Sequence, residues 1–255
     1  MTYNSVKSDT STIYSSYGIR SVQNSCAYFL PSVEPNSRIL DVGCGGGTIT
    51  CDMAAIASLG HVTGLDVSEG TLETARAEAQ RRGSLDNITF VKESAYDLTR
   101  FDDDTFDIVH AHQVLLHLMD PVKALREFRR VCKPGGLVAC RDADMTSARF
   151  EPDLPGLRKY ASIFPKFVPR RGAFTKTWAL EAGFDEKNMI TSIVDMDQPS
   201  HLQVVSDEKK MAELYPSLYV VKEEMELMRR DWEEWSTTEG SYWILEAYQI
   251  VCRKF

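Results

Sequence analysis

The chain lacks the sequence features of membrane-spanning, disulfide-linked and nucleic-acid-binding proteins. No run of apolar residues approaches the roughly 18 that indicate a membrane-spanning helix. No two of the six cysteines have C-x-x-C spacing, which disfavours a zinc site and favours free thiols in a reducing compartment. The net charge of −8 opposes a general nucleic-acid binder, and the polar first residues hold no signal-peptide core. We therefore expect a cytoplasmic protein with no metal site, no membrane span and no nucleic-acid partner.

The chain does have the composition and the alternation of a large α/β domain. Its 255 residues are 43% hydrophobic, enough to form a sizeable core. Short apolar segments alternate with helix-compatible segments up to residue 141, which is typical of a parallel sheet covered on both faces. The pattern predicts strands at 38–42, 61–66, 88–92, 106–111, 137–141, 189–196 and 243–252, and helices at 48–59, 68–80, 121–132, 174–184 and 206–235.

A glycine-rich turn follows the first predicted strand. That strand carries Asp41 near its end, and glycines occupy positions 43, 45, 46 and 47. Glycine allows backbone angles with φ > 0 and lets a ligand lie against bare main chain. A dinucleotide fingerprint needs a sixth-place glycine where Thr48 stands, and a P-loop needs a Lys-Ser or Lys-Thr pair that is missing here. A nicotinamide-dependent oxidoreductase is thus the weaker alternative for this turn.

The spacing Asp41-x-Gly43-x-Gly45-x-Gly47 resembles motif I of class I S-adenosylmethionine-dependent methyltransferases. Further markers follow in the order expected of that family: Asp66, Ser94-Ala95, Phe106–His117 with Asp120-Pro121, and the turn Lys133–Gly136. The resemblance covers residues 35–144 and looks closest to the small-molecule branch with the ubiquinone and menaquinone methyltransferases. It implies an α/β, Rossmann-like, open and mostly parallel seven-stranded sheet with helices on both faces, plus a helical cap.

The resemblance also implies that the cofactor is S-adenosylmethionine and assigns its parts to residues. Asp66 would accept hydrogen bonds from the ribose hydroxyls, and Val67 would pack on the adenine. Ser94 stands where the family usually has an aspartate, and its hydroxyl can accept the bond from the adenine amino group. The cofactor-binding residues implied in this way are Asp41, Gly43, Gly45, Gly47, Asp66, Val67, Ser94, Ala95, Ala111, His112 and Gln113.

The domain prediction follows from the same resemblance and from the loss of alternation after residue 144. We expect an N-terminal helical lid at 1–36 and a methyltransferase domain at 37–255, with substrate-cap insertions at about 145–173 and 199–240. The candidate substrate contacts are Tyr17, Asn24, His117 and Asp144. Asp142 and Asp144 follow the strand at 137–141, where they could act on substrate or cap the insertion.

The expected function is methyl transfer to a small-molecule acceptor by direct in-line displacement. Alignment and exclusion of water are then the protein's main tasks, and a base is needed only for a protonated nucleophile. The candidate bases are His112 and Asp142. His110 shares a strand face with His112, which suits ordinary hydrogen bonds better than a metal. The alternative is a protein of the same fold that binds the cofactor without transferring methyl, as a regulator or as the catalyst of another rearrangement. A monomer and a homodimer are both compatible with the sequence.

Overall fold

The computed structural model describes residues 20–83, 86–163, 171–197 and 222–255. Tyr17, most of the predicted insertion at 199–240 and the first part of the predicted helix at 206–235 lie outside these residues. Within the described part of the chain, no helix has the length and apolar character needed to cross a membrane.

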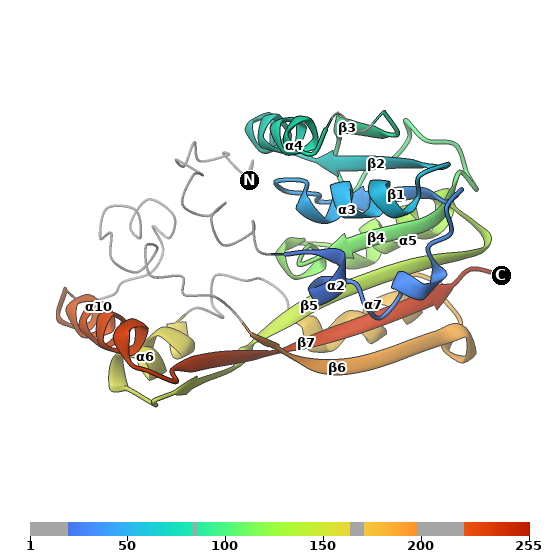
Figure 1. The fold of residues 1–255 in the computed structure, drawn as a ribbon. Coiled ribbons are helices and arrows are strands. Elements are labelled where there is room, and N and C mark those ends of the chain that lie inside the picture. The colour runs from blue at the N-terminus through green and yellow to red at the C-terminus, as the bar shows by residue number, and fades with distance from the viewer. Residues whose placement is uncertain (1–19, 84–85, 164–170, 198–221) are drawn as a thin grey trace. The chain divides into compact units, whose positions relative to one another are not determined.

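The strands form one seven-stranded sheet, which confirms the predicted fold class (Figure 1). Its strands in spatial order are β3 (Ile88–Lys92), β2 (His61–Asp66), β1 (Arg38–Val42), β4 (Phe106–His112), β5 (Cys132–Glu151), β7 (Tyr242–Arg253) and β6 (Met189–Asp197). The pairs joining β3, β2, β1, β4 and β5 are all parallel. The carboxyl ends of these strands therefore meet at one edge of the sheet, where open α/β folds bind their ligands.

The helices begin where the sequence supplies capping groups. The Ser68 hydroxyl accepts the N–H of Thr71 at the start of α4, and Asp120 accepts the N–H of Lys123 before Pro121 opens α5. The α-helices are α2 (Val22–Ser25), α3 (Thr48–Ile56), α4 (Glu69–Arg81), α5 (Pro121–Val131), α6 (Pro155–Ile163), α7 (Thr175–Glu181) and α10 (Lys222–Thr237). Short 3-10 turns are η1 (Leu30–Ser32), η2 (Leu115–His117), η4 (Gly172–Phe174) and η5 (Glu186–Asn188).

The chain divides into two compact units. Among the described residues, the larger holds 20–143, 171–194 and 247–255, and the smaller holds 144–163, 195–197 and 222–246. The predicted lid and the predicted insertion boundaries stay predictions.

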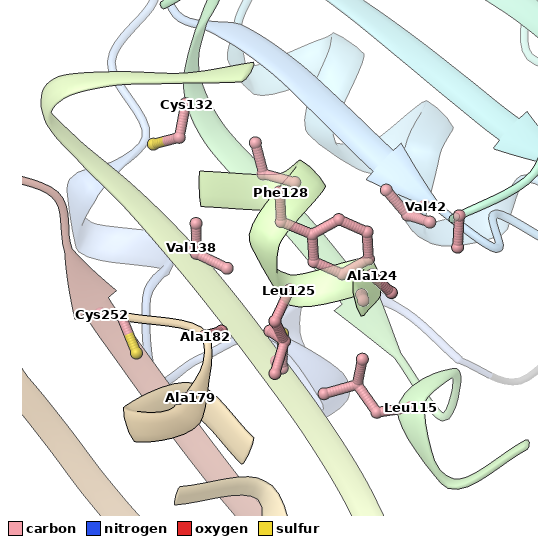
Figure 2. Packing of buried hydrophobic residues seen from close by; sticks show 14 of the residues in the cluster. Val42, Leu115, Ala124, Leu125, Phe128, Cys132, Val138, Ala179, Ala182 and Cys252 are labelled. Atoms are coloured by element: carbon pink, nitrogen blue, oxygen red, sulfur yellow. The ribbon is translucent and has the colours of Figure 1, made fainter. Parts of the chain in front are cut away.

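In the larger unit, two hydrophobic clusters cover the two faces of the sheet. Leu40 and Val42 of β1 belong to one cluster, and Ile39, which precedes Leu40, belongs to the other, as strand alternation requires. The first cluster packs α5 and α7 against the sheet, with Leu125 and Phe128 beside β5 (Figure 2). The second packs α3 and the segment after α2 against the opposite face. Burial on both sides explains why these strands read as continuous apolar runs.

The smaller unit has an aromatic core of its own. Phe150 stacks on Trp243 at 5.2 Å between ring centroids, and Tyr160 meets Trp232 edge-on at 4.9 Å. Trp235 donates its ring N–H to the Glu151 carbonyl at 3.0 Å. The tryptophans at the predicted helical positions therefore pack inward on a core.

Strand β5 differs most from its prediction. It runs without interruption from Cys132 to Glu151, through both the predicted turn at 133–136 and the start of the predicted insertion. The register to β4 shifts between Phe106 and Ile108, so residues 133–136 form a bulge, in which Gly135 has φ 81°. A bulge carries turn-like residues inside a strand, which is why the sequence pattern indicated a turn.

Candidate functional site

The glycine turn lies at the centre of the carboxyl edge. It follows β1, which pairs with β2 on one side and β4 on the other. Gly43, Gly45 and Gly47 all have positive φ, at 69°, 54° and 79°. Gly47 is the N-cap of α3, and a Cβ there would lie 2.8 Å from the Cβ of Ala75. A Cβ on Gly43 would come within 2.5 Å of Val114, so these two glycines are required by packing as well as by backbone angle.

Gly45 differs from its neighbours because no atom of the described residues lies within 4 Å of a Cβ built on it. Its positive φ favours glycine, and the open space leaves room for a ligand against bare main chain. Asp66 at the end of β2 joins the turn directly, because Gly45 N–H donates to Asp66 Oδ2 at 3.2 Å and Ser68 N–H donates to Oδ1 at 3.0 Å. Burial raises the pKa of Asp66, although these backbone donors oppose the shift.

The surroundings of Asp66 fit a nucleoside. Val67 is 65% exposed, an apolar surface beside a carboxylate that can accept from ribose hydroxyls. The Ser94 hydroxyl accepts the N–H of Tyr96 at 3.2 Å and retains a second lone pair for another donor. Ala95 and Ala111 are buried in the first hydrophobic cluster, so contact with a cofactor would come from their backbone. The open space at Gly45, the carboxylate and the exposed Val67 together fit S-adenosylmethionine.

Replacing Ser94 with aspartate is expected to keep or tighten adenosine binding. An aspartate can accept the same Tyr96 N–H and adds a charged acceptor for the adenine amino group. Replacing Ser94 with alanine removes the hydroxyl oxygen that accepts the Tyr96 N–H and would accept from the adenine amino group, and should weaken binding. Calorimetric titration of both variants with S-adenosylmethionine tests this, and weaker binding by the aspartate variant than by the alanine variant would contradict the alignment of Ser94 with adenine.

The end of β4 carries a strained residue and an unpaired histidine. Gln113 has φ 58°, unusual for a residue other than glycine, and its side-chain oxygen accepts the N–H of Ala143 at 3.3 Å. His112 is 8% exposed, and neither ring nitrogen has a hydrogen-bond partner among the described residues. Burial lowers the pKa of His112 well below its ordinary value, helped by the charges of Arg20, His110 and Arg141. The imidazole is therefore neutral at pH 7 and able to accept a proton.

Asp142 lies on the neighbouring strand β5 and is fully buried. Its Oδ1 accepts the N–H of Leu116 at 3.1 Å, and its Oδ2 has no partner within the part of the chain that the structure describes. Burial raises the pKa of Asp142 to about 7, against the stabilising effect of backbone N–H groups. One oxygen thus holds the η2 turn in place, while the other is available.

The structure describes three of the four predicted substrate residues. Asn24 completes a capping box with Ser21 at the start of α2, and His117 is exposed at the end of η2. Asp144 belongs to the smaller unit and accepts both the N–H and the hydroxyl of Thr146. Tyr17 lies outside the described residues. Their roles toward substrate stay predictions.

The sequence alone did not reveal one part of the site, a buried connection from Asp41 to His110 and Thr50. Asp41 was assigned to the cofactor, but it is 3% exposed and both its oxygens are hydrogen-bonded inside the protein. Direct register between Asp41 and His110 across β1 and β4 creates this contact. No group of side chains suited to a metal ion occurs among the described residues.

Comparison with known proteins gives the family. A methyltransferase-domain family model matches residues 40–140. An uncharacterized methyltransferase of Schizosaccharomyces pombe is 38% identical over 193 residues, covering 71% of this chain and 69% of that protein. The chain belongs to the class I S-adenosylmethionine-dependent methyltransferases. Its cofactor is S-adenosylmethionine.

Two further similarities bear on this methyltransferase. A demethylmenaquinone methyltransferase of Staphylococcus epidermidis is 39% identical over 138 residues, covering 54% of this chain and 53% of that protein. The match thus spans about half of each chain. The structure of the YcgJ protein from Bacillus subtilis has a TM-score of 0.61 at 20% identity, covering 91% of this chain and 98% of that one, which shows a shared fold.

Proposed function

We propose that this methyltransferase acts on a small-molecule acceptor by direct in-line displacement. The supporting observation is the carboxyl edge of β1, β4 and β5. There, a glycine turn with open space at Gly45 stands beside a strand that ends in the unpaired His112. When bound, the cofactor supplies a methyl group already activated by its sulfonium. The protein's own contribution is to align the acceptor and to exclude water.

Within this proposal, His112 is the base that takes a proton from the acceptor. Its ring is neutral, and neither ring nitrogen has a hydrogen-bond partner among the described residues, so it retains a lone pair that can accept a proton. Asp142 is less suited to the role, because one of its oxygens already accepts the Leu116 N–H. A base is required for a phenol or an acidic carbon, and the similarity to a demethylmenaquinone methyltransferase makes a ring carbon of that kind the first acceptor to test.

Replacing His112 with alanine is expected to lower kcat about 100-fold or more with such an acceptor, a larger effect than the change in cofactor affinity. The matched control is His61→Ala. His61 contacts the Thr89 hydroxyl at the amino end of β2, whereas the site lies at the carboxyl ends of the strands. Steady-state kinetics and calorimetric titration measure the two quantities. A His112 variant with normal kcat would remove this residue from the chemistry.

The pH profile separates His112 from Asp142. With His112 as the base, its lowered pKa leaves the ring neutral throughout the neutral range, so kcat/KM should be flat from about pH 6.5 to 8. With Asp142 as the base, activity would rise as the carboxyl loses its proton near pH 7. A rise near pH 7 that disappears in Asp142→Asn would reassign the base.

Methyl transfer itself is tested by incubation with methyl-labelled cofactor and a panel of phenols, demethylated quinols and amines. Label should move to a member of the panel in the wild type but not in a variant that cannot bind cofactor. Normal cofactor binding with no transfer to any small molecule would favour the alternative, a protein of this fold that binds the cofactor for regulation or for another rearrangement.

A further inference from the structure

Four buried polar side chains form a continuous chain behind the glycine turn. Cys26 Sγ lies 3.5 Å from His110 Nε2, and His110 Nδ1 lies 2.7 Å from Asp41 Oδ1. The Thr50 hydroxyl donates to Asp41 Oδ2 at 2.6 Å. Cys26, His110 and Thr50 are fully buried. The chain joins the segment after α2, strands β4 and β1, and the first turn of α3.

The neighbours of His110 favour its protonated form, which fixes the direction of its hydrogen bonds. Burial alone would lower the pKa of His110, but the neighbouring Cys26 sulfur and Asp41 carboxylate outweigh it and raise the pKa to about 10. Both ring nitrogens of the resulting imidazolium are donors, so one points to Asp41 and the other to the Cys26 sulfur. The Phe29 ring, 5.0 Å away between centroids, and His112, 6.3 Å away, lie beside it. A buried carboxylate at position 41 is stabilised by this cation and by Thr50.

The chain of contacts bridges both ends of the turn. Asp41 lies two residues before Gly43, and Thr50 lies three residues after Gly47. Their hydrogen bond joins the two ends of the strand–turn–helix segment, and we call this Asp41–Thr50 contact the clasp. The three glycines with positive φ lie between its two residues. His110 fixes the rotamer of Asp41 from the opposite side, because the two residues pair in register. Asp41 is 3% exposed and each of its oxygens already accepts a hydrogen bond inside the protein, which favours a structural role for this carboxylate.

We propose that His110 is a positioning residue of the cofactor site, which orients Asp41 so that Asp41 and Thr50 together hold the glycine turn in its binding geometry. Cys26 ties the same clasp to the segment after α2. This inference rests on the proposed use of the turn for the cofactor. It gives Asp41 a role through the backbone of the turn in place of direct contact with the ligand.

The mildest test is Thr50→Val, which removes the hydroxyl but keeps the side-chain shape. In this variant the Asp41 carboxylate keeps its contact with His110. We expect about a tenfold rise in the Kd for S-adenosylhomocysteine and in the KM for the cofactor, with kcat within about twofold. Thr50→Ser should restore affinity, because it returns the donor. The matched control is Ile108→Val, a core change on the same face of β4 that should leave Kd unchanged.

A double-mutant cycle then tests His110 itself. His110→Gln and Asp41→Asn should each weaken binding about tenfold, and the double variant should recover most of the loss, because two neutral amides can hydrogen-bond in place of the ion pair. Circular dichroism and thermal melting identify any variant that fails to fold, in which case the Thr50 pair alone decides. Unchanged Kd in folded Thr50→Val, or strictly additive losses in the cycle, would overturn the proposal.

Failure of this inference is distinguishable from failure of the proposed function. If wild-type protein does not bind S-adenosylhomocysteine, the assignment of the turn to the cofactor fails. If wild type binds and Gly45→Ala loses binding while the Thr50 and His110 variants bind normally, the turn is the cofactor site and only the clasp is refuted.

Discussion

Replacing Gly45 with alanine is expected to weaken S-adenosylmethionine binding by about tenfold or more. The residue has φ 54°, which costs an alanine roughly 1–2 kcal/mol, and its Cβ would enter the open space beside the turn. Because no atom of the described residues lies within 4 Å of that Cβ, the added methyl group should clash with a bound ligand and not with the protein. Calorimetric titration with S-adenosylmethionine and S-adenosylhomocysteine measures the loss.

Two alanine variants separate ligand contact from backbone strain. Gly83, at the end of α4, also has a positive φ, 101°, and nothing among the described residues lies within 4 Å of a Cβ built on it, so Gly83→Ala should lower stability while Kd stays normal. Gly46→Ala lies in the turn but meets only an ordinary contact with Thr74 at 3.8 Å. Normal binding by Gly45→Ala would mean that the open space at this glycine does not receive the cofactor.

Replacing Asp66 with alanine is expected to weaken binding about 100-fold or more. Loss of two charge-assisted hydrogen bonds to the ribose costs roughly 1.5–3 kcal/mol each, and about 1.4 kcal/mol corresponds to a tenfold change. The Gly45 N–H also loses its acceptor, which loosens the turn. S-adenosylmethionine and S-adenosylhomocysteine share the ribose, so both affinities should fall by the same factor.

The control for Asp66 is Ser68→Ala. It removes the side-chain cap of α4 but leaves the Ser68 N–H that donates to Asp66. A loss of thermal stability with normal Kd is expected, since a cap contributes about 1 kcal/mol. Unchanged affinity in Asp66→Ala, or a loss confined to one of the two ligands, would contradict the placement of the ribose.

The first half of the fold could be predicted from local sequence patterns. The bounds of β1, β2 and β3 agree with the strands predicted from apolar runs. Strands β1 and β2 are buried on both faces, and the edge strand β3 is partly buried. Ser68 and the Asp120-Pro121 pair predicted the starts of α4 and α5, since a cap acts within one turn of the residues it stabilises. The glycine turn was found for the same reason, as positive φ is a property of single residues.

The local sequence pattern did not predict the length of β5, because contacts with residues distant in the sequence stabilise its second half. Its residues beyond Asp144 were assigned to an insertion because the alternation of strands and helices is lost there, yet the strand continues to Glu151. Partners about a hundred residues away stabilise the extension, with Phe150 stacked on Trp243 and the Ser147 hydroxyl accepting the Glu246 N–H. No local pattern encodes such contacts.

The sequence by itself determined the family, the open α/β sheet and the glycine turn with Asp66 beside it, because each depends on spacing along a few residues. Only the tertiary structure decided which side chains Asp41 contacts. Its contacts with His110 and Thr50 depend on strand register and helix docking, and the neighbouring Cys26 and Asp41 then outweigh burial and favour the charged form of His110. Register and burial arise from the whole fold, so a residue that the sequence pattern assigns to the ligand can belong to the frame that holds the ligand site.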